Sequence, residues 1–199
     1  MSIICKANQK EHELDVTSYR LTIEPEIRKR HIKGAVTINF QISPNANSIV
    51  LNSGSLLIDS VAGKNDDLLI IKLSKREKRE NEITIKNHGS PTKGLLFNSK
   101  LDQAYTVYFT SQWMICNDKP SDKATLNLNI LIPNGLKCIA NGELIGVEKI
   151  ERKTLFRWSQ KYEPPSYTYG FAIGNFKEES ENTRIFNSTI FLTQTAMTH

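Results

Sequence analysis

Apolar and polar side chains alternate along two consecutive stretches near the start of the chain. In residues 15–24 the pattern has one irregularity near Ser18, and in residues 31–42 it runs from Ile32 to Ile42. A period of two is typical of strands that bury one face. The short charged segment between the stretches predicts an antiparallel hairpin. Gly34 predicts a bulge within the second strand.

Short runs of the same kind continue to the end of the chain, and Gly, Asn, Asp, Ser or Pro residues separate them. They cover residues 48–51, 56–61, 68–73, 82–86, 104–109, 124–132, 136–140, 143–150, 154–160, 167–173 and 184–193. No stretch has the apolar stripe of an amphipathic helix. Strands at this spacing predict an all-β fold, either a sandwich or a closed sheet. No shift in composition marks a boundary, so we expect a single domain.

Three local features make the predicted topology more specific. Asn141 and Gly142 predict a hairpin between residues 136–140 and 143–150, and residues 154–160 would complete a meander. Residues 89–103 have no clear period, so we expect a loop whose apolar residues Leu95, Leu96 and Phe97 pack under the sheet. Tyr167 and Tyr169 should share one face of a central strand.

The stretch from Trp113 to Thr125 is unusual because it combines apolar residues with a polar turn. Trp113, Met114 and Ile115 are too apolar for a plain surface loop, so we expect them, like Trp158, to be buried. Residues 117–122 form a turn in which short polar side chains bind the local backbone. The stretch is either an ordinary hairpin-like connection or a functional loop that two strands position.

Within this turn, Asp118 and Lys123 could form an ion pair that holds the loop. A catalytic role for Asp118 is disfavoured, because no acid or histidine lies near it in the sequence and turn aspartates usually bind their own backbone.

Composition excludes several classes of partner. The 199 residues carry a formal net charge of +5 with a pI near 9.0. The densest basic cluster, residues 72–79, lies between two predicted strands and has no interleaved aromatics, which favours a solvated turn over a nucleic-acid surface. No apolar run is long enough to span a bilayer. We therefore expect no nucleic acid and no membrane as partners.

The cysteines indicate the redox compartment. Cys5, Cys116 and Cys138 are odd in number and fit no zinc or redox motif. Together with the lack of a visible secretory signal, they predict reduced thiols and a cytoplasmic location. His12 and Glu13 could begin a zinc-binding H-E-x-x-H helix, but Val16 stands where the second histidine should be.

Five segments, in order and at their spacing, resemble the N-terminal domain of the aminopeptidase N family of zinc metallopeptidases, which includes the leukotriene hydrolases. They are Val16-Thr-Ser-Tyr-Arg-Leu, His31-Ile-Lys-Gly-Ala-Val-Thr-Ile, Cys116-Asn-Asp-Lys-Pro-Ser-Asp-Lys-Ala, Ile139-Ala-Asn-Gly-Glu-Leu and Pro165-Ser-Tyr-Thr-Tyr-Gly-Phe-Ala-Ile-Gly-Asn-Phe. The resemblance covers nearly the whole chain and implies a saddle-like, mostly antiparallel β-sandwich over residues 15–193. Residues 1–14 would be a flexible tail, and residues 194–199 would lead to a missing catalytic domain.

The resemblance also implies that the chemistry lies elsewhere in a longer parent protein. Family members hold zinc with H-E-x-x-H and bind the substrate partly with G-x-M-E-N, and neither motif is present here. We therefore expect no catalytic residue, metal ligand or cofactor in this chain, and no activity from it alone. The implied parent removes N-terminal residues from peptides. The implied partners are its own C-terminal catalytic domain and, in the full-length protein, the peptide substrate.

One residue of this chain is a candidate for substrate binding. The family carries a Thr-Gln-x-Glu-like segment before its Cys-x-Asp-x-Pro turn, and the resemblance places residues 109–116 at that point. Gln112 is the plausible match, while the glutamate is missing and the segment is shorter. Gln112 would either point into a cleft shared with the missing domain or lie on the surface at a strand end.

Two other functions are compatible with the same fold. The chain could be a stand-alone protein-interaction module, or a small sandwich that binds carbohydrate through exposed aromatic side chains. A domain that has lost its neighbour should expose an apolar patch around the Trp113 turn and the last strand, whereas a free module should not. We expect such a patch.

Overall fold

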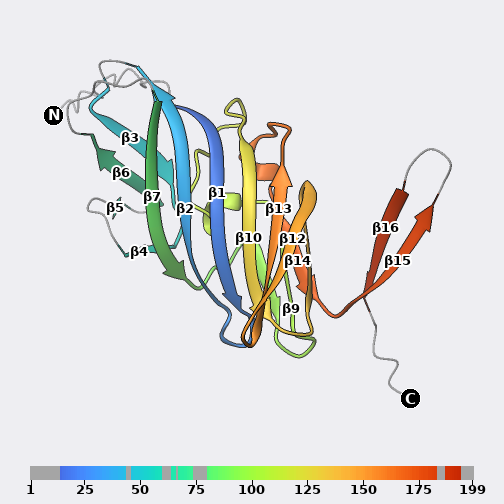
Figure 1. The fold of residues 1–199 in the computed structure, drawn as a ribbon. Coiled ribbons are helices and arrows are strands. Elements are labelled where there is room, and N and C mark those ends of the chain that lie inside the picture. The colour runs from blue at the N-terminus through green and yellow to red at the C-terminus, as the bar shows by residue number, and fades with distance from the viewer. Residues whose placement is uncertain are drawn as a thin grey trace.

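The computed structural model describes residues 14–43, 46–59, 64–65, 67–73, 80–182 and 187–193. In this part of the chain the regular structure consists of strands and three single-turn 3-10 helices, so the all-β prediction is confirmed (Figure 1). Of the predicted tail at residues 1–14, all but Leu14, which begins the first strand, lies outside the described residues. The tail at residues 194–199 and most of the basic cluster at residues 72–79 lie outside them as well.

The largest sheet has seven strands. In spatial order they are β12 (Glu143–Ile150), β13 (Lys153–Gln160), β10 (Thr125–Pro133), β1 (Leu14–Glu26), β2 (His31–Ile42), β7 (Glu80–Gly89) and β4 (Leu57–Ile58). The predicted β1–β2 hairpin is present, and the 3-10 turn η1 (Ile27–Lys29) connects its strands. β1 pairs with β10 in parallel and the other described pairs are antiparallel, which confirms the mostly antiparallel fold.

Three smaller sheets complete the described structure. The four-stranded sheet has the order β11 (Lys137–Ala140), β14 (Phe171–Gly174), β9 (Gln103–Thr106) and β8 (Leu95–Asn98). The three-stranded sheet consists of β3 (Ser48–Asn52), β6 (Leu68–Lys72) and β5 (Lys64–Asn65). β15 (Phe176–Asn182) and β16 (Asn187–Thr193) pair with each other as a separate hairpin (Figure 1).

The core lies between the seven-stranded sheet and the smaller sheets. Alternate residues of β1, such as Tyr19, Leu21 and Ile23, are buried, as strand periodicity requires. They belong to the same buried cluster as Leu51 of β3 and Ile173 of β14. The seven-, four- and three-stranded sheets therefore each bury one face in a common core and leave the other face outside.

The predicted bulge at Gly34 is wrong, and the irregularity of this hairpin lies in β1 instead. Gly34 pairs regularly with Ile23, whereas the register of the hairpin shifts between Val16 and Ser18, at the irregularity in the sequence pattern. A Cβ atom at Gly34 would lie 2.5 Å from the carbonyl oxygen of Thr22. Glycine is therefore needed here because the neighbouring backbone approaches closely, and not because an extra residue interrupts the ladder.

The Asn141–Gly142 turn does not connect two paired strands, so the predicted hairpin is wrong. β11 pairs with β14, while β12 pairs with β13. Gly142 has a φ of +88°, which is the turn conformation that its sequence indicates. The chain uses this turn to pass from the four-stranded sheet to the seven-stranded one. The second half of the predicted meander, the β12–β13 hairpin, is correct.

Two other local predictions are also wrong. Residues 95–98 form strand β8 instead of a loop, and of the three apolar residues only Leu95 is fully buried. Tyr167 lies in the 3-10 turn η3 (Ser166–Thr168), where it is exposed, whereas Tyr169 is buried. The two tyrosines therefore do not share a strand face, although β14, which begins at Phe171, is central in its sheet as predicted.

Candidate functional site

The stretch that follows β9 connects the four-stranded sheet to the seven-stranded sheet, so it is not a hairpin connection. It contains the 3-10 turn η2 (Thr110–Gln112) and then four fully buried residues, Trp113, Met114, Ile115 and Cys116. The Trp113 ring packs edge-to-face on Phe171, with ring centroids 5.3 Å apart. The predicted apolar anchors are thus confirmed, as is the burial of Trp158.

Hydrogen bonds from three directions hold the polar turn after these anchors. The backbone N–H of Asn117 donates to the phenol oxygen of Tyr19 at 2.9 Å. Cys116 exchanges two backbone hydrogen bonds with Asn52, at 2.7 and 3.1 Å. The hydroxyl of Ser166 donates to Oδ1 of Asp118 at 3.0 Å. The turn is therefore attached to β1, to β3 and to η3, which fixes its position between the layers.

The predicted Asp118–Lys123 ion pair is not among the ion pairs of the described residues. Asp122 is the turn carboxylate that binds the backbone: its Oδ1 accepts from the N–H of Val16 at 3.0 Å, and its Oδ2 accepts from Nδ2 of Asn117 at 2.8 Å. Partial burial raises the pKa of Asp122, and these two hydrogen bonds oppose that rise.

Gln112 is half-buried at the end of η2, and its amide packs against the backbone of Gly54. A Cβ atom at Gly54 would lie 2.7 Å from Nε2 and 2.8 Å from Cδ of Gln112. Gly54 also has a φ of +48°, a conformation that favours glycine. The loop after β3 thus leaves room for the Gln112 side chain, and no described contact assigns that side chain to a ligand.

Two aromatic residues that the sequence pattern did not single out directly precede η2, and the backbone N–H of Gln112 donates to the carbonyl oxygen of the second, Phe109, at 3.0 Å. Tyr108 and Phe109 are 72% and 59% exposed, and both have positive φ angles, 43° and 46°. Such angles are uncommon for bulky residues and often mark functional sites. Gly94 makes the turn possible, because a Cβ atom there would lie 2.5 Å from the carbonyl oxygen of Phe109. The sequence did not indicate this turn, because residues 104–109 are apolar to the end of the run and predict a strand that continues to Phe109.

The outer face of the four-stranded sheet is apolar where it adjoins this aromatic pair. Strand registers place Leu96 of β8, Tyr105 of β9, Ala172 of β14 and Ile139 of β11 in one cross-strand row. Leu96 and Tyr105 are exposed, while Ala172 and Ile139 are partly exposed. We call this row, together with Tyr108 and Phe109, the apolar face; no described segment covers it.

The outer face of the seven-stranded sheet has the opposite character. One cross-strand row consists of Ser159, Asn127, Arg20, Thr37 and Thr84. The hydroxyls of Thr37 and Thr84 are hydrogen-bonded at 2.8 Å. Polar side chains that bind one another across strands are typical of a sheet face in contact with water. This row contrasts with the apolar face, although β12 at the edge of the same sheet exposes Leu144, Ile145, Val147 and Ile150.

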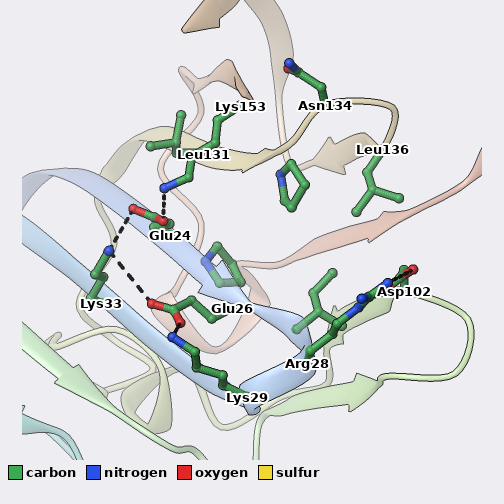
Figure 2. A pocket seen from close by; sticks show the side chains of 13 residues that line it. Glu24, Glu26, Arg28, Lys29, Lys33, Asp102, Leu131, Asn134, Leu136 and Lys153 are labelled. Carbon is green, nitrogen blue, oxygen red and sulfur yellow. Dashed lines mark hydrogen bonds and ion pairs between the residues drawn. The ribbon is translucent and has the colours of Figure 1, made fainter. Parts of the chain in front are cut away.

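A pocket of about 650 Å³ opens at the end of the β1–β2 hairpin (Figure 2). We call it the edge pocket. Its walls carry seven charged side chains: Glu24, Glu26, Arg28, Lys29, Lys33, Asp102 and Lys153. Its apolar lining comes from Pro25, Ile27, Leu131, Pro133 and Leu136, and Asn134 completes it.

Ion pairs connect most of the charges in the edge pocket. Glu24 bridges Lys33, at 3.3 Å, and Lys153. Glu26 lies 2.5 Å from the ammonium of Lys29, and this hydrogen bond is the main cause that lowers the pKa of Glu26. Figure 2 shows Arg28 and Asp102 paired on the other side of the pocket, and two N–O distances of 3.2 and 3.3 Å join them.

The described residues do not offer a metal site. His31 and His88 stack with ring centroids 5.8 Å apart, and Nδ1 of His88 lies 2.6 Å from Oδ1 of Asp59. Even so, no group of three or more His, Cys, Asp or Glu residues in this part of the chain is placed to hold a metal ion. No helix among the described residues is long and apolar enough to cross a membrane.

Residues 16–108 match the sequence profile of the peptidase M1 N-terminal domain. Over these residues the sequence is that of an M1 N-terminal domain. This finding confirms the family resemblance, and three of the five segments that carry the resemblance lie beyond the matched residues.

Several known proteins are similar to this chain in sequence or in fold. Leucine aminopeptidase 2 from Aspergillus niger is 34% identical over 73 residues, which are 35% of this chain and 12% of that protein. An M1 zinc metallopeptidase from Deinococcus radiodurans has the same fold, with a TM-score of 0.78 and 18% identity over 90% of this chain and 46% of its own. A mutant M1 zinc metallopeptidase from that organism, bound to a Tyr-Ser-Ala substrate, gives a TM-score of 0.77, 18% identity and coverage of 88% and 46%.

The chain spans less than half the length of these relatives. The names of the two structures mention zinc. Among the described residues of this chain, no group of His, Cys, Asp or Glu side chains is placed to hold such an ion.

Proposed function

We propose that this domain is the non-catalytic N-terminal part of a zinc aminopeptidase, that it packs on a catalytic domain through its apolar face, and that it forms one wall of the substrate cleft. The contrast between the two outer faces supports this proposal most directly. Monomeric proteins rarely leave a contiguous apolar patch uncovered without a function. Aromatic residues such as Tyr105, Tyr108 and Phe109 are the type that anchors interfaces.

The buried, hydrogen-bonded stretch after η2 supports the same proposal. Residues 113–117 are buried and hydrogen-bonded to β1 and β3, so the neighbouring aromatic pair is presented on a rigid base. A rigid base lowers the entropy that a side chain loses when a partner covers it. The positive φ angles of Tyr108 and Phe109 direct these side chains away from the core at a cost in backbone strain, and contacts with a partner would offset that cost.

Gln112 is the residue of this domain that we propose for contact with the peptide substrate. It lies next to the aromatic pair, and its amide can donate and accept hydrogen bonds. Its half-buried position against Gly54 would hold the amide at the margin of the proposed cleft. Because no glutamate accompanies it, we propose that the substrate's amine is bound mainly by groups of the parent outside this chain.

The parent protein, expressed with whatever follows residue 199, tests the proposal. We expect bound zinc and release of N-terminal residues from aminoacyl amides by the long form, and neither from residues 1–199 alone. In the long form, Q112A should raise KM with little change in kcat, while the matched variant N127A, at an exposed position on the outer face of the seven-stranded sheet, should change neither. A long form without zinc or activity would instead favour a stand-alone interaction module.

A further inference from the structure

The edge pocket lies at the end of the β1–β2 hairpin, and its charged end is on the outer face of the seven-stranded sheet. Glu24 and Lys33 face each other across β1 and β2 at outward positions, and Lys153 lies at the same end of the sheet on β13. These three side chains are on the outer face of the sheet, whereas Pro25 and Ile27, which also line the pocket, are buried. None of the residues that line the pocket belongs to the apolar face, so the two sites are separate.

The charges that line the pocket do not cancel. Four side chains are cationic, namely Arg28, Lys29, Lys33 and Lys153, and three are anionic, namely Glu24, Glu26 and Asp102, which leaves one excess positive charge. One further anionic group would neutralise the pocket.

Two ammonium groups meet at one end and retain free hydrogen-bonding capacity. An ammonium has three N–H donors. The ammonium of Lys33 lies 3.3 Å from Glu24 and 3.8 Å from Glu26, which is beyond hydrogen-bond distance, and Lys153 donates one hydrogen bond to Glu24. Figure 2 shows both ammonium groups directed at Glu24 from opposite sides. A carboxylate could accept from the remaining donors of both lysines without displacing Glu24.

The rest of the pocket is apolar and held in place. Leu131, Pro133 and Leu136 line it next to this charged end. The turn that carries Leu136 is fixed by Asn134, whose Nδ2 donates to the carbonyl oxygen of Glu151 at 3.0 Å and whose Oδ1 accepts from Thr154 at 2.8 Å. A small apolar group could thus be buried while an attached charge reaches the lysines, as in most small-molecule sites.

We propose that the edge pocket binds a carboxylate carried on a small apolar body, with Lys33 and Lys153 on the carboxylate and Leu131 and Leu136 on the body. The C-terminal residue of a peptide and a free organic acid share this chemistry. The site is separate from the apolar face, so this proposal does not depend on the aminopeptidase assignment.

The test uses amide NMR shifts of the 199-residue chain during titration with N-acetyl-leucine. We expect saturable shifts around Lys153, Leu131 and Asn134, with a Kd in the range of about 1 mM. N-acetyl-leucinamide, which lacks the charge, and acetate, which lacks the body, should each bind at least about tenfold more weakly. Raising the salt concentration should weaken binding of N-acetyl-leucine, because salt screens partly exposed charges.

Variants separate this site from general attraction to a basic protein. K153Q should weaken binding by about fivefold or more, while K149Q, at an exposed position on the neighbouring edge strand, should leave it unchanged. L131T should weaken binding, and its cross-strand partner variant L155T should not. Equal binding of the acid and the amide, equal effects of K153Q and K149Q, or no saturable shift would each overturn the proposal.

A second titration distinguishes the two sources of the ligand. Tighter binding of Gly-Gly-Leu than of N-acetyl-leucine, lost when the peptide is amidated, would identify a peptide C-terminus. Tighter binding of N-acetyl-leucine would identify a free organic acid. Either result is consistent with the proposed site.

Discussion

The phenol oxygen of Tyr19, in the middle of β1, accepts a hydrogen bond from the backbone N–H of Asn117, 98 positions later in the chain. Both residues are buried. The bond connects the seven-stranded sheet to the turn that supports the aromatic pair. Burial raises the pKa of Tyr19 well above its ordinary value, so the phenol stays neutral and can accept this bond at physiological pH.

Y19F should lower the free energy of unfolding by about 1–3 kcal/mol, because it leaves the buried N–H of Asn117 without an acceptor. Y169F is the matched control. The Tyr169 hydroxyl donates to the carbonyl oxygen of Ala124 at 2.7 Å, and an under-satisfied carbonyl costs less than an orphaned N–H. Urea unfolding of both variants measures the difference. A smaller loss for Y19F than for Y169F would contradict the role given to Asn117.

The free energy of unfolding should depend on pH through the titration of Asp122. Partial burial raises its folded-state pKa, so in the window just above the ordinary aspartate range the folded chain binds more protons than the unfolded chain. The contribution of Asp122 to stability should therefore fall as pH rises through this window. In D122N this part of the slope should disappear, which unfolding curves between pH 4 and 7 would reveal. An unchanged slope would mean that Asp122 titrates normally.

D122A tests the hydrogen bonds of the same side chain at neutral pH. It removes the acceptors for the N–H of Val16 and the amide of Asn117, and we expect a loss of about 1–3 kcal/mol of unfolding free energy. D118A removes only the acceptor for the Ser166 hydroxyl and should cost less. The reverse order in urea unfolding would show that Asp118 is the main support of the turn.

G54A should destabilise the fold by more than about 1 kcal/mol, because Gly54 has a positive φ and the new methyl group would overlap the Gln112 amide. Adding Q112A to G54A should recover part of the loss. Full recovery is not expected, since the carbonyl oxygen of Ser111 would still lie 2.8 Å from the methyl carbon. Thermal unfolding of the single and double variants measures the coupling, and strict additivity would contradict the contact.

Cys116 and Cys138 should resist alkylation in the folded chain. Both thiols are buried and free, and burial raises the pKa of each, so little reactive thiolate forms. In a C5S variant, mass spectrometry after iodoacetamide treatment should show no modification natively and two modifications in denaturant. Fast native labelling would mean that the layers around the turn open readily.

The sequence predicted most reliably the parts in which one face of a long segment is buried. The β1–β2 hairpin followed from regular alternation over more than ten residues, and even its irregularity at Ser18 corresponds to a real register shift. The burial of Trp113, Met114 and Ile115 also followed, because three such residues have no favourable place in water.

The sequence could not show which sheet each short strand joins. Asn141 and Gly142 have the local chemistry of a hairpin, but β11 finds its partner in β14 over 30 residues later, where tertiary packing outweighs the local signal. β8 is too short for its period to be recognised. The exposure of Tyr108 and Phe109 depends on two positive φ angles and on close contact with Gly94. Positive φ angles are uncommon for bulky residues, so the sequence gives no reason to expect them here.

The most direct test of the account is whether the apolar face holds the rest of the parent protein. Residues 1–199 and the remainder of the parent, expressed separately, should associate, and F109D should weaken that association by about thirtyfold or more, as for an interface hot spot. Y162D is the matched control, because Tyr162 is 84% exposed but lies outside the apolar face. We expect Y162D to bind normally and both variants to fold. Equal binding by the unmodified chain, F109D and Y162D would contradict the account.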